Sequence, residues 1–232
     1  MAISFTGKRE PIVRLFNIVY KLVRALYHKP SIFGLDRITK KNPSIYVANH
    51  LGSYGPVAIM SFFPFQLYPW VTHEVTEKRK CAEYLEEEFV YKELKLKPPM
   101  SRMLSSVIGG ICVALMKHLE VIPVYKKNRR ISYSLDLSAR YLAQGKDLLI
   151  FPEISDWVLN DLICKFDSGF INIARLHFER HNERVSFYPV AVNRDRRSIK
   201  LGNSVVFNPH RPFIGEKRRI VQELEERVCS MI

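Results

Sequence analysis

The feature that most constrains this 232-residue chain is a regular alternation of short apolar runs with segments of helical length. The runs are rich in β-branched and aromatic residues and predict strands at Ile45–Ala48, Leu67–Thr72, Val121–Tyr125, Leu148–Phe151, Phe187–Val192 and Ser204–Phe207. Between them we expect helices at Pro56–Phe62, Val75–Glu93, Ser101–His118, Ile131–Gln144, Ser168–His181 and Glu216–Met231. Strands that alternate with helices predict an α/β fold with a mostly parallel mixed sheet flanked by helices.

The first thirty residues differ from the rest. Pro11–Tyr27 predicts a helix in which Arg14, Lys21 and Arg24 belong to one polar stripe beside a wide apolar arc. Such a helix suits a membrane interface, although a core helix with an exposed basic edge has the same pattern. We therefore expect an N-terminal amphipathic, membrane-interfacial segment at residues 1–30 and a single α/β domain at residues 31–232, a length that supports a full core.

A second apolar segment, Met103–Met116, carries no charge. It is shorter than the ~20 residues that cross a bilayer, so we expect a buried helix or a re-entrant, substrate-facing segment rather than a span.

The charge and the cysteines limit the partners and the location of the chain. Lys and Arg outnumber Asp and Glu by 36 to 23, which favours anionic partners such as lipid surfaces, phosphorylated substrates or nucleic acid. Nucleic acid is not expected as a partner, because the chain lacks glycine-aromatic RNA motifs and a helix-turn-helix pattern. The 4 cysteines lack metal-ligand spacing and are interpreted as free thiols in a reducing compartment. With no signal-peptide pattern, we expect the cytoplasmic side of a membrane.

Two loops that follow predicted strands carry the most reactive residues. Asn49-His50 follows Ile45–Ala48, and Phe151-Pro152-Glu153 follows the strand that begins at Leu148. These loops predict one shared active site.

Several segments in order resemble the motifs of the glycerophospholipid acyltransferases, the lysophosphatidic acid acyltransferase-like superfamily. Asn49-His50 resembles the start of the N-H-x-x-x-x-D motif, Val121–Lys126 the second motif, and Phe151-Pro152-Glu153 the F-P-E-G motif. Lys165–Gly169 is similar to the turn that usually follows, and Tyr188–Val192 to the V-P-V block. The resemblance covers roughly residues 31–192 and implies the acyltransferase fold.

The resemblance implies transfer of a fatty acyl group from acyl-CoA or acyl carrier protein to a hydroxyl of a lysophospholipid or glycerol phosphate. His50 would be the general base that takes the proton of the attacking hydroxyl. Main-chain N–H groups at the start of the next helix, with Gly52 and Gly55 allowing close approach, would stabilise the oxyanion. No metal or other cofactor is implied. The residues implied to bind substrate are Asn49, Ser53, Lys126, Phe151, Pro152 and Glu153.

The chain departs from the family pattern at the position of the dyad aspartate, where it has Gly55. Two hypotheses follow. Either another carboxylate orients His50, or the chain is a weak or inactive member that binds lipid or acyl-CoA without turnover. The candidate carboxylates are Glu74, Glu153, Asp156 and Asp161.

Overall fold

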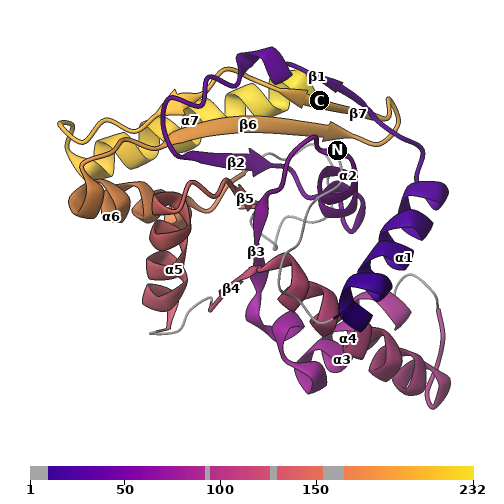
Figure 1. The fold of residues 1–232 in the computed structure, drawn as a ribbon. Helices are drawn as coiled ribbons and strands as arrows, with labels where there is room; N and C mark the ends of the chain where they lie inside the picture. The colour runs from indigo at the N-terminus through magenta and orange to yellow at the C-terminus, as the bar shows by residue number, and fades with distance from the viewer. Residues whose placement is uncertain (1–9, 92–94, 126–129, 154–164) are drawn as a thin grey trace. The chain divides into compact units, whose positions relative to one another are not determined.

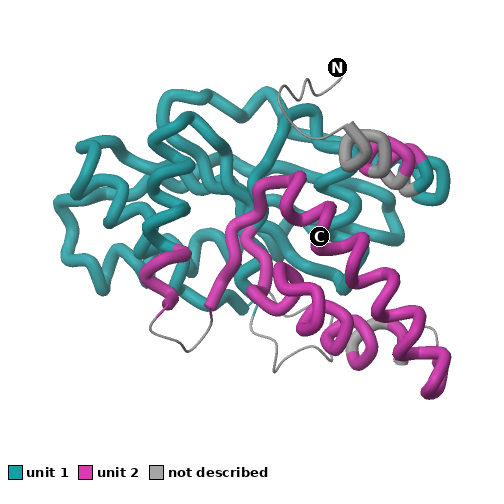
Figure 2. The backbone as a smooth tube through the Cα atoms, turned by 60° about the horizontal axis from the view of Figure 1, so that its bottom comes forward, with its two compact units in different colours: residues 1, 22–69, 135–232 teal, residues 2–21, 70–134 magenta. Residues whose placement is uncertain are grey.

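The computed structural model describes residues 10–91, 95–125, 130–153 and 165–232. It is an α/β structure with a mostly parallel mixed sheet flanked by helices, as predicted (Figure 1). Residue contacts divide the chain into two compact units (Figure 2): unit 1 holds residues 22–69 and 135–232, and unit 2 holds residues 2–21 and 70–134. The expected boundary near residue 30 and the membrane-interfacial role of helix α1 (Glu10–Leu26) stay predictions.

Unit 1 contains most of the sheet. Its strands are β1 (Ser31–Phe33), β2 (Ser44–Ala48), β5 (Leu148–Ile150), β6 (Ser186–Asn193), β7 (Ser198–Leu201) and β8 (Val205–Val206). The order is β1-β7-β6-β2-β5, and the first residues of β3 (Tyr68–Thr72) pair with β5. β2 is parallel to both β5 and β6, while β7 and β8 run antiparallel to β6. The centre of the sheet is therefore parallel.

Helices cover both faces of this sheet. All five residues of β2 are buried, as expected for a parallel strand with helices on either side. Tyr46 and Ala48 belong to a core with Ala58 and Ile59 of α2 (Tyr54–Phe62). On the other face, Phe187 of β6 contacts the ring of Phe170 in the 3₁₀ turn η5 (Ser168–Ile171). Helices α6 (Asn172–His181) and α7 (Phe213–Met231) follow, and α7 packs along β6 (Figure 1).

Unit 2 is mainly helical. The 3₁₀ turn η2 (His73–Thr76) precedes α3 (Lys78–Leu85), a π-helical turn (Glu86–Tyr91), α4 (Met100–Leu119) and β4 (Ile122–Val124). β4 is parallel to Trp70–Thr72 of β3. Helix α5 (Ile131–Ala143) begins in unit 2 and ends in unit 1.

Helices α3 and α4 pack closely. A Cβ atom on Gly109 of α4 would lie 3.1 Å from the main chain of Ala82 in α3, so glycine permits this approach. Helix α4 has 20 residues, more than the apolar segment predicted from the sequence. By length and composition it could cross a bilayer, a test that core helices of soluble proteins also pass.

All six predicted strands are confirmed, and three other predictions need correction. β1 and β7 were not expected; each has no more than four residues, too few for a periodic pattern. The helix expected at Val75–Glu93 begins only at Lys78, because Glu77 is extended and cannot continue a helix. Cys81 and Cys112 are free thiols, but Cys229 is disulfide-bonded, so the prediction of four free thiols is wrong.

Asp147 lies just before β5 and is partly buried. Burial raises the pKa of its carboxyl to about 6, against the opposing attraction of Lys40. The folded state therefore holds this proton more tightly than the unfolded chain does. The protonated Asp147 carboxyl contributes its full share to the free energy of unfolding below about pH 4, and this contribution is lost as the pH rises through about 6.

We expect Asp147→Asn to raise the free energy of unfolding at pH 8 by about 1–3 kcal/mol, since a tenfold change in proton affinity corresponds to about 1.4 kcal/mol. At pH 4 the variant should match the wild type. Urea unfolding at both pH values measures this, with the exposed Asp195→Asn as control. An equal gain at both pH values would contradict the assignment.

Candidate functional site

The two loops singled out by their sequence meet in unit 1. β2 and β5 are adjacent and parallel, with Val47 opposite Ile150, so the residues after both strands emerge at the same edge of the sheet. This edge, at the carboxyl ends of parallel strands, is where open α/β sheets bind ligands. The local fold thus brings Asn49-His50 beside Phe151-Pro152-Glu153.

Asn49 ties the end of β2 to β6. Its side-chain nitrogen donates to the main-chain oxygen of Val192 at 2.9 Å, and its side-chain oxygen accepts from the Val192 N–H at 2.7 Å. The residue is only 2% exposed. The amide therefore extends the β2–β6 ladder beyond Ala48, a structural role that the motif alone did not reveal.

His50 leaves the strand into an unusual turn. Leu51 and Gly52, the next two residues, have φ values of 48° and 60°, in the left-handed region. His50 is exposed, and its ring lies edge-on to that of Phe151 with centroids 5.1 Å apart. The imidazole is thus presented to solvent beside an aromatic wall.

Glu153 reaches back to the same residue. Its Oε2 accepts a hydrogen bond from the main-chain N–H of His50 at 2.8 Å. The main chain of Glu153 also forms an isolated antiparallel β-bridge with that of Phe166. Next to it, the Pro152 carbonyl accepts a hydrogen bond from the N–H of Asp167 at 2.7 Å. The F-P-E turn and the turn that follows at residues 165–169 therefore support each other and hold a carboxylate beside His50.

Gly55 sits where an aspartate side chain has no room. A Cβ atom there would lie 2.3 Å from the His50 carbonyl oxygen and 2.9 Å from that of Asn49. The Gly55 N–H donates to the His50 carbonyl at 3.1 Å, and the Tyr54 N–H to that of Leu51 at 3.2 Å. These two N–H groups are already bonded, so they do not form the oxyanion site expected at the start of this helix.

The remaining candidate residues are placed as follows. Ser53 is exposed at the start of α2 and makes no capping hydrogen bond. Glu74 belongs to unit 2, where it binds Thr72 and His73. Lys126, Asp156 and Asp161 lie outside the described residues. Glu153 is the candidate carboxylate that the structure brings to His50.

Sequence reasoning missed a cavity of about 460 Å³ in unit 2. Its lining residues are Lys78, Arg79, Ala82, Glu83, Glu86, Arg102, Ser105 and Ser106. The exposed charges of α3 gave no signal for it, because it depends on how α3 packs against α4. In the part of the chain that the structure describes, no group of three His, Cys, Asp or Glu side chains could hold a metal ion.

We expect Gly55→Ala to lower the free energy of unfolding by about 1–3 kcal/mol, because the added methyl group overlaps the His50 carbonyl. Gly215→Ala in α7 is the matched control: its Cβ meets nothing within 4 Å, so it should be neutral or stabilise by roughly 0.5 kcal/mol. Chemical denaturation of both variants measures the difference. Equal stability of the two would show that the turn at His50 relaxes freely.

No protein-family model matches the chain, and searches of curated proteins and of solved structures find no significant match.

Proposed function

We propose that the protein is an O-acyltransferase that moves a fatty acyl group from acyl-CoA or acyl carrier protein to a hydroxyl of a lysophospholipid or glycerol phosphate. The observation that carries the proposal is the 2.8 Å hydrogen bond from the His50 N–H to Glu153, which joins two motifs about one hundred residues apart. The parallel pairing of β2 with β5 makes this meeting a property of the fold.

His50 supplies the chemistry in this proposal. Its imidazole takes the proton of the acceptor hydroxyl while that oxygen attacks the thioester carbonyl carbon. Collapse of the tetrahedral intermediate breaks the carbon–sulfur bond, forms the ester and releases the thiol. The side chain is exposed at the edge of the sheet, so two substrates can reach it from solvent.

Glu153 positions His50 in this scheme. Its hydrogen bond to the His50 N–H holds the main chain of this residue in place.

The setting that we propose is the cytoplasmic face of an anionic membrane, with the protein bound peripherally. The net charge of +13 supports attraction to anionic lipid.

A second candidate function is binding of lipid or acyl-CoA without turnover. It is favoured by Gly55, whose surroundings exclude a side chain at the position of the family's aspartate. This alternative predicts saturable binding with no release of thiol.

The deciding experiment measures thiol release from acyl-CoA and acyl carrier protein donors with lysophosphatidic acid, other lysolipids and glycerol phosphate. We expect His50→Ala to lower the rate by about 10²–10⁴-fold, the usual contribution of a general base. The exposed His210→Ala should retain the wild-type rate. Silence of the wild type across the panel, together with saturable ligand binding, would establish the second candidate instead.

A separate prediction concerns Glu153. The glutamine variant keeps a carbonyl oxygen that can accept the His50 N–H, so Glu153→Gln should retain a rate within about threefold of wild type. Glu153→Ala loses the acceptor and should fall in both rate and stability, by about 1–3 kcal/mol for a bond to a charged group. Steady-state rates and urea unfolding separate these effects. Loss of activity in the glutamine variant without loss of stability would mean that the charge itself is required.

A further inference from the structure

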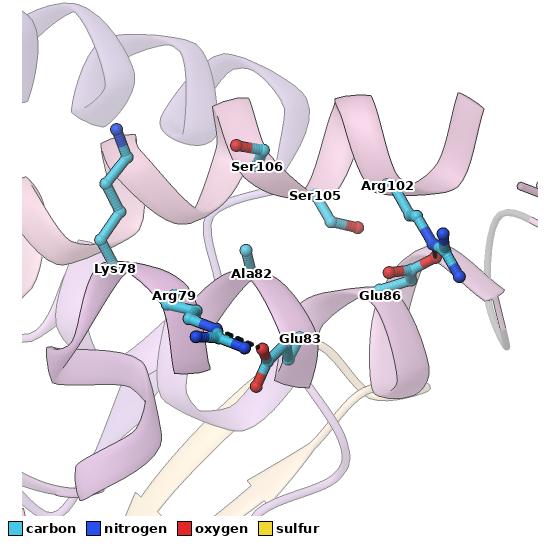
Figure 3. Close-up of a pocket in the computed structure, with 8 residues that line it drawn as sticks. All are labelled: Lys78, Arg79, Ala82, Glu83, Glu86, Arg102, Ser105 and Ser106. Carbon is cyan, nitrogen blue, oxygen red and sulfur yellow. Dashed lines mark hydrogen bonds and ion pairs between the residues drawn. The ribbon is translucent and has the colours of Figure 1, made fainter. Parts of the chain in front are cut away.

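Helices α3 and α4 of unit 2 lie side by side, and Figure 3 shows them on the two sides of the cavity. Their contacts follow one antiparallel register. Near the start of α4, Ser101 donates a hydrogen bond to Glu86 at 2.8 Å. Further along, Gly109 approaches the main chain of Ala82, with a Cβ position 3.1 Å from it. Later residues of α4 therefore meet earlier residues of α3.

The thiols of Cys81 and Cys112 form the next contact of this register. Cys112 lies three residues beyond Gly109, on the same side of α4, and Cys81 is adjacent to Ala82. The Cys81 S–H group donates a hydrogen bond to the Cys112 sulfur. A disulfide requires Cα atoms within about 7 Å of each other, and the close approach at Gly109 brings the two main chains together.

The two cysteines differ in their access to solvent. Cys81 is 0% exposed, whereas Cys112 is partly exposed. A small oxidant in solvent therefore reaches Cys112 first, while Cys81 stays inside the helix pair. An accessible cysteine beside a protected second thiol is the arrangement of an attacking and a resolving cysteine.

The proton affinities of the two thiols give the same order of reaction. Burial raises the pKa of the Cys81 thiol to about 12, and its neighbour Cys112 adds to this rise. Burial also raises the pKa of the Cys112 thiol, but the hydrogen bond from Cys81 opposes that rise. Because the thiolate is the nucleophile, Cys112 is the more reactive sulfur of the pair. Both thiols are protonated at neutral pH, so their oxidation is slow.

We infer that Cys81 and Cys112 are an oxidation site at which a small peroxide forms a reversible disulfide between α3 and α4. Hydrogen peroxide oxidises the Cys112 thiol to a sulfenic acid and is itself reduced, releasing one water. The Cys81 sulfur then attacks the Cys112 sulfur, and the sulfenic hydroxyl leaves with the Cys81 proton as a second water. The pair loses two electrons in total, which an external dithiol returns. The inference does not depend on acyl transfer.

Peptide mapping of the full chain tests the inference. Trypsin releases the two cysteines on separate peptides, residues 81–92 and residues 103–117. After treatment of the protein with hydrogen peroxide and blocking of the remaining thiols, we expect these two peptides to be joined by a disulfide. Dithiothreitol should separate them again.

Single variants assign the order of attack. Cys81→Ala leaves Cys112 without a resolving thiol, so its sulfenic acid should accumulate and be trapped by dimedone. Cys112→Ala leaves only the buried thiol, which should react with peroxide at least about tenfold more slowly than Cys112 does. Ser106→Ala on α4 is the matched control and should form the same link at the wild-type rate.

Thermal unfolding shows whether the link fits the folded helix pair. A disulfide that closes a loop of about thirty residues should raise the melting temperature of the protein by roughly 5–10 °C. The same peroxide treatment should leave the melting temperature of each alanine variant without this rise.

Four results would each overturn the inference. The first is the absence of the link between residues 81–92 and 103–117, and the second is a link from either cysteine to Cys229 or to a second chain in its place. The third is equal reactivity of the two alanine variants with peroxide. The fourth is a melting temperature of the linked protein no higher than that of the reduced protein, which would mean that the link distorts the helix pair.

Discussion

The two hydrogen bonds between the Asn49 side chain and the main chain of Val192 fix the point at which the chain leaves the sheet. In a parallel ladder the final residue of a strand has main-chain groups that no longer find a partner. The asparagine amide has the same donor and acceptor as a peptide group, and it meets this need inside the core. The following residue is then free to turn outward at a defined place. The exposure of His50, its contact with Phe151 and its bond to Glu153 all follow from that exit.

Much of the fold could be predicted because its central strands are buried on both faces. A continuous apolar run such as Ile45–Ala48 is a strong signal when turn or helix patterns flank it. The short edge strands gave no such signal: β1 is partly exposed, and its pairing with β7 depends on partners distant in the sequence. The break before α3 was missed because Val75 to Glu93 looks helical throughout. The extended conformation of Glu77 comes from the turn after β3, which composition does not encode.

The candidate site was predictable in part for a similar reason. Motif order placed His50 and Glu153 at strand ends, and parallel pairing brings such ends together. The role of each side chain was not predictable, because it depends on which main-chain groups come within reach. Asn49 was expected to bind substrate, yet both polar atoms of its amide bond Val192. The sequence also did not indicate that the buried Ser105 hydroxyl lacks a hydrogen-bond partner among the described residues, because this results from the close packing of α3 on α4.

The close fit around Gly55 has a consequence for the substitutions that this chain can accept. The space for a side chain at this position is taken by the carbonyl groups of Asn49 and His50, so the local backbone and the residue are coupled. Substitutions at coupled positions are not additive. Introducing a carboxylate here would require compensating changes in the left-handed turn at Leu51 and Gly52. A single exchange at residue 55 therefore also disturbs the turn that presents His50 to solvent.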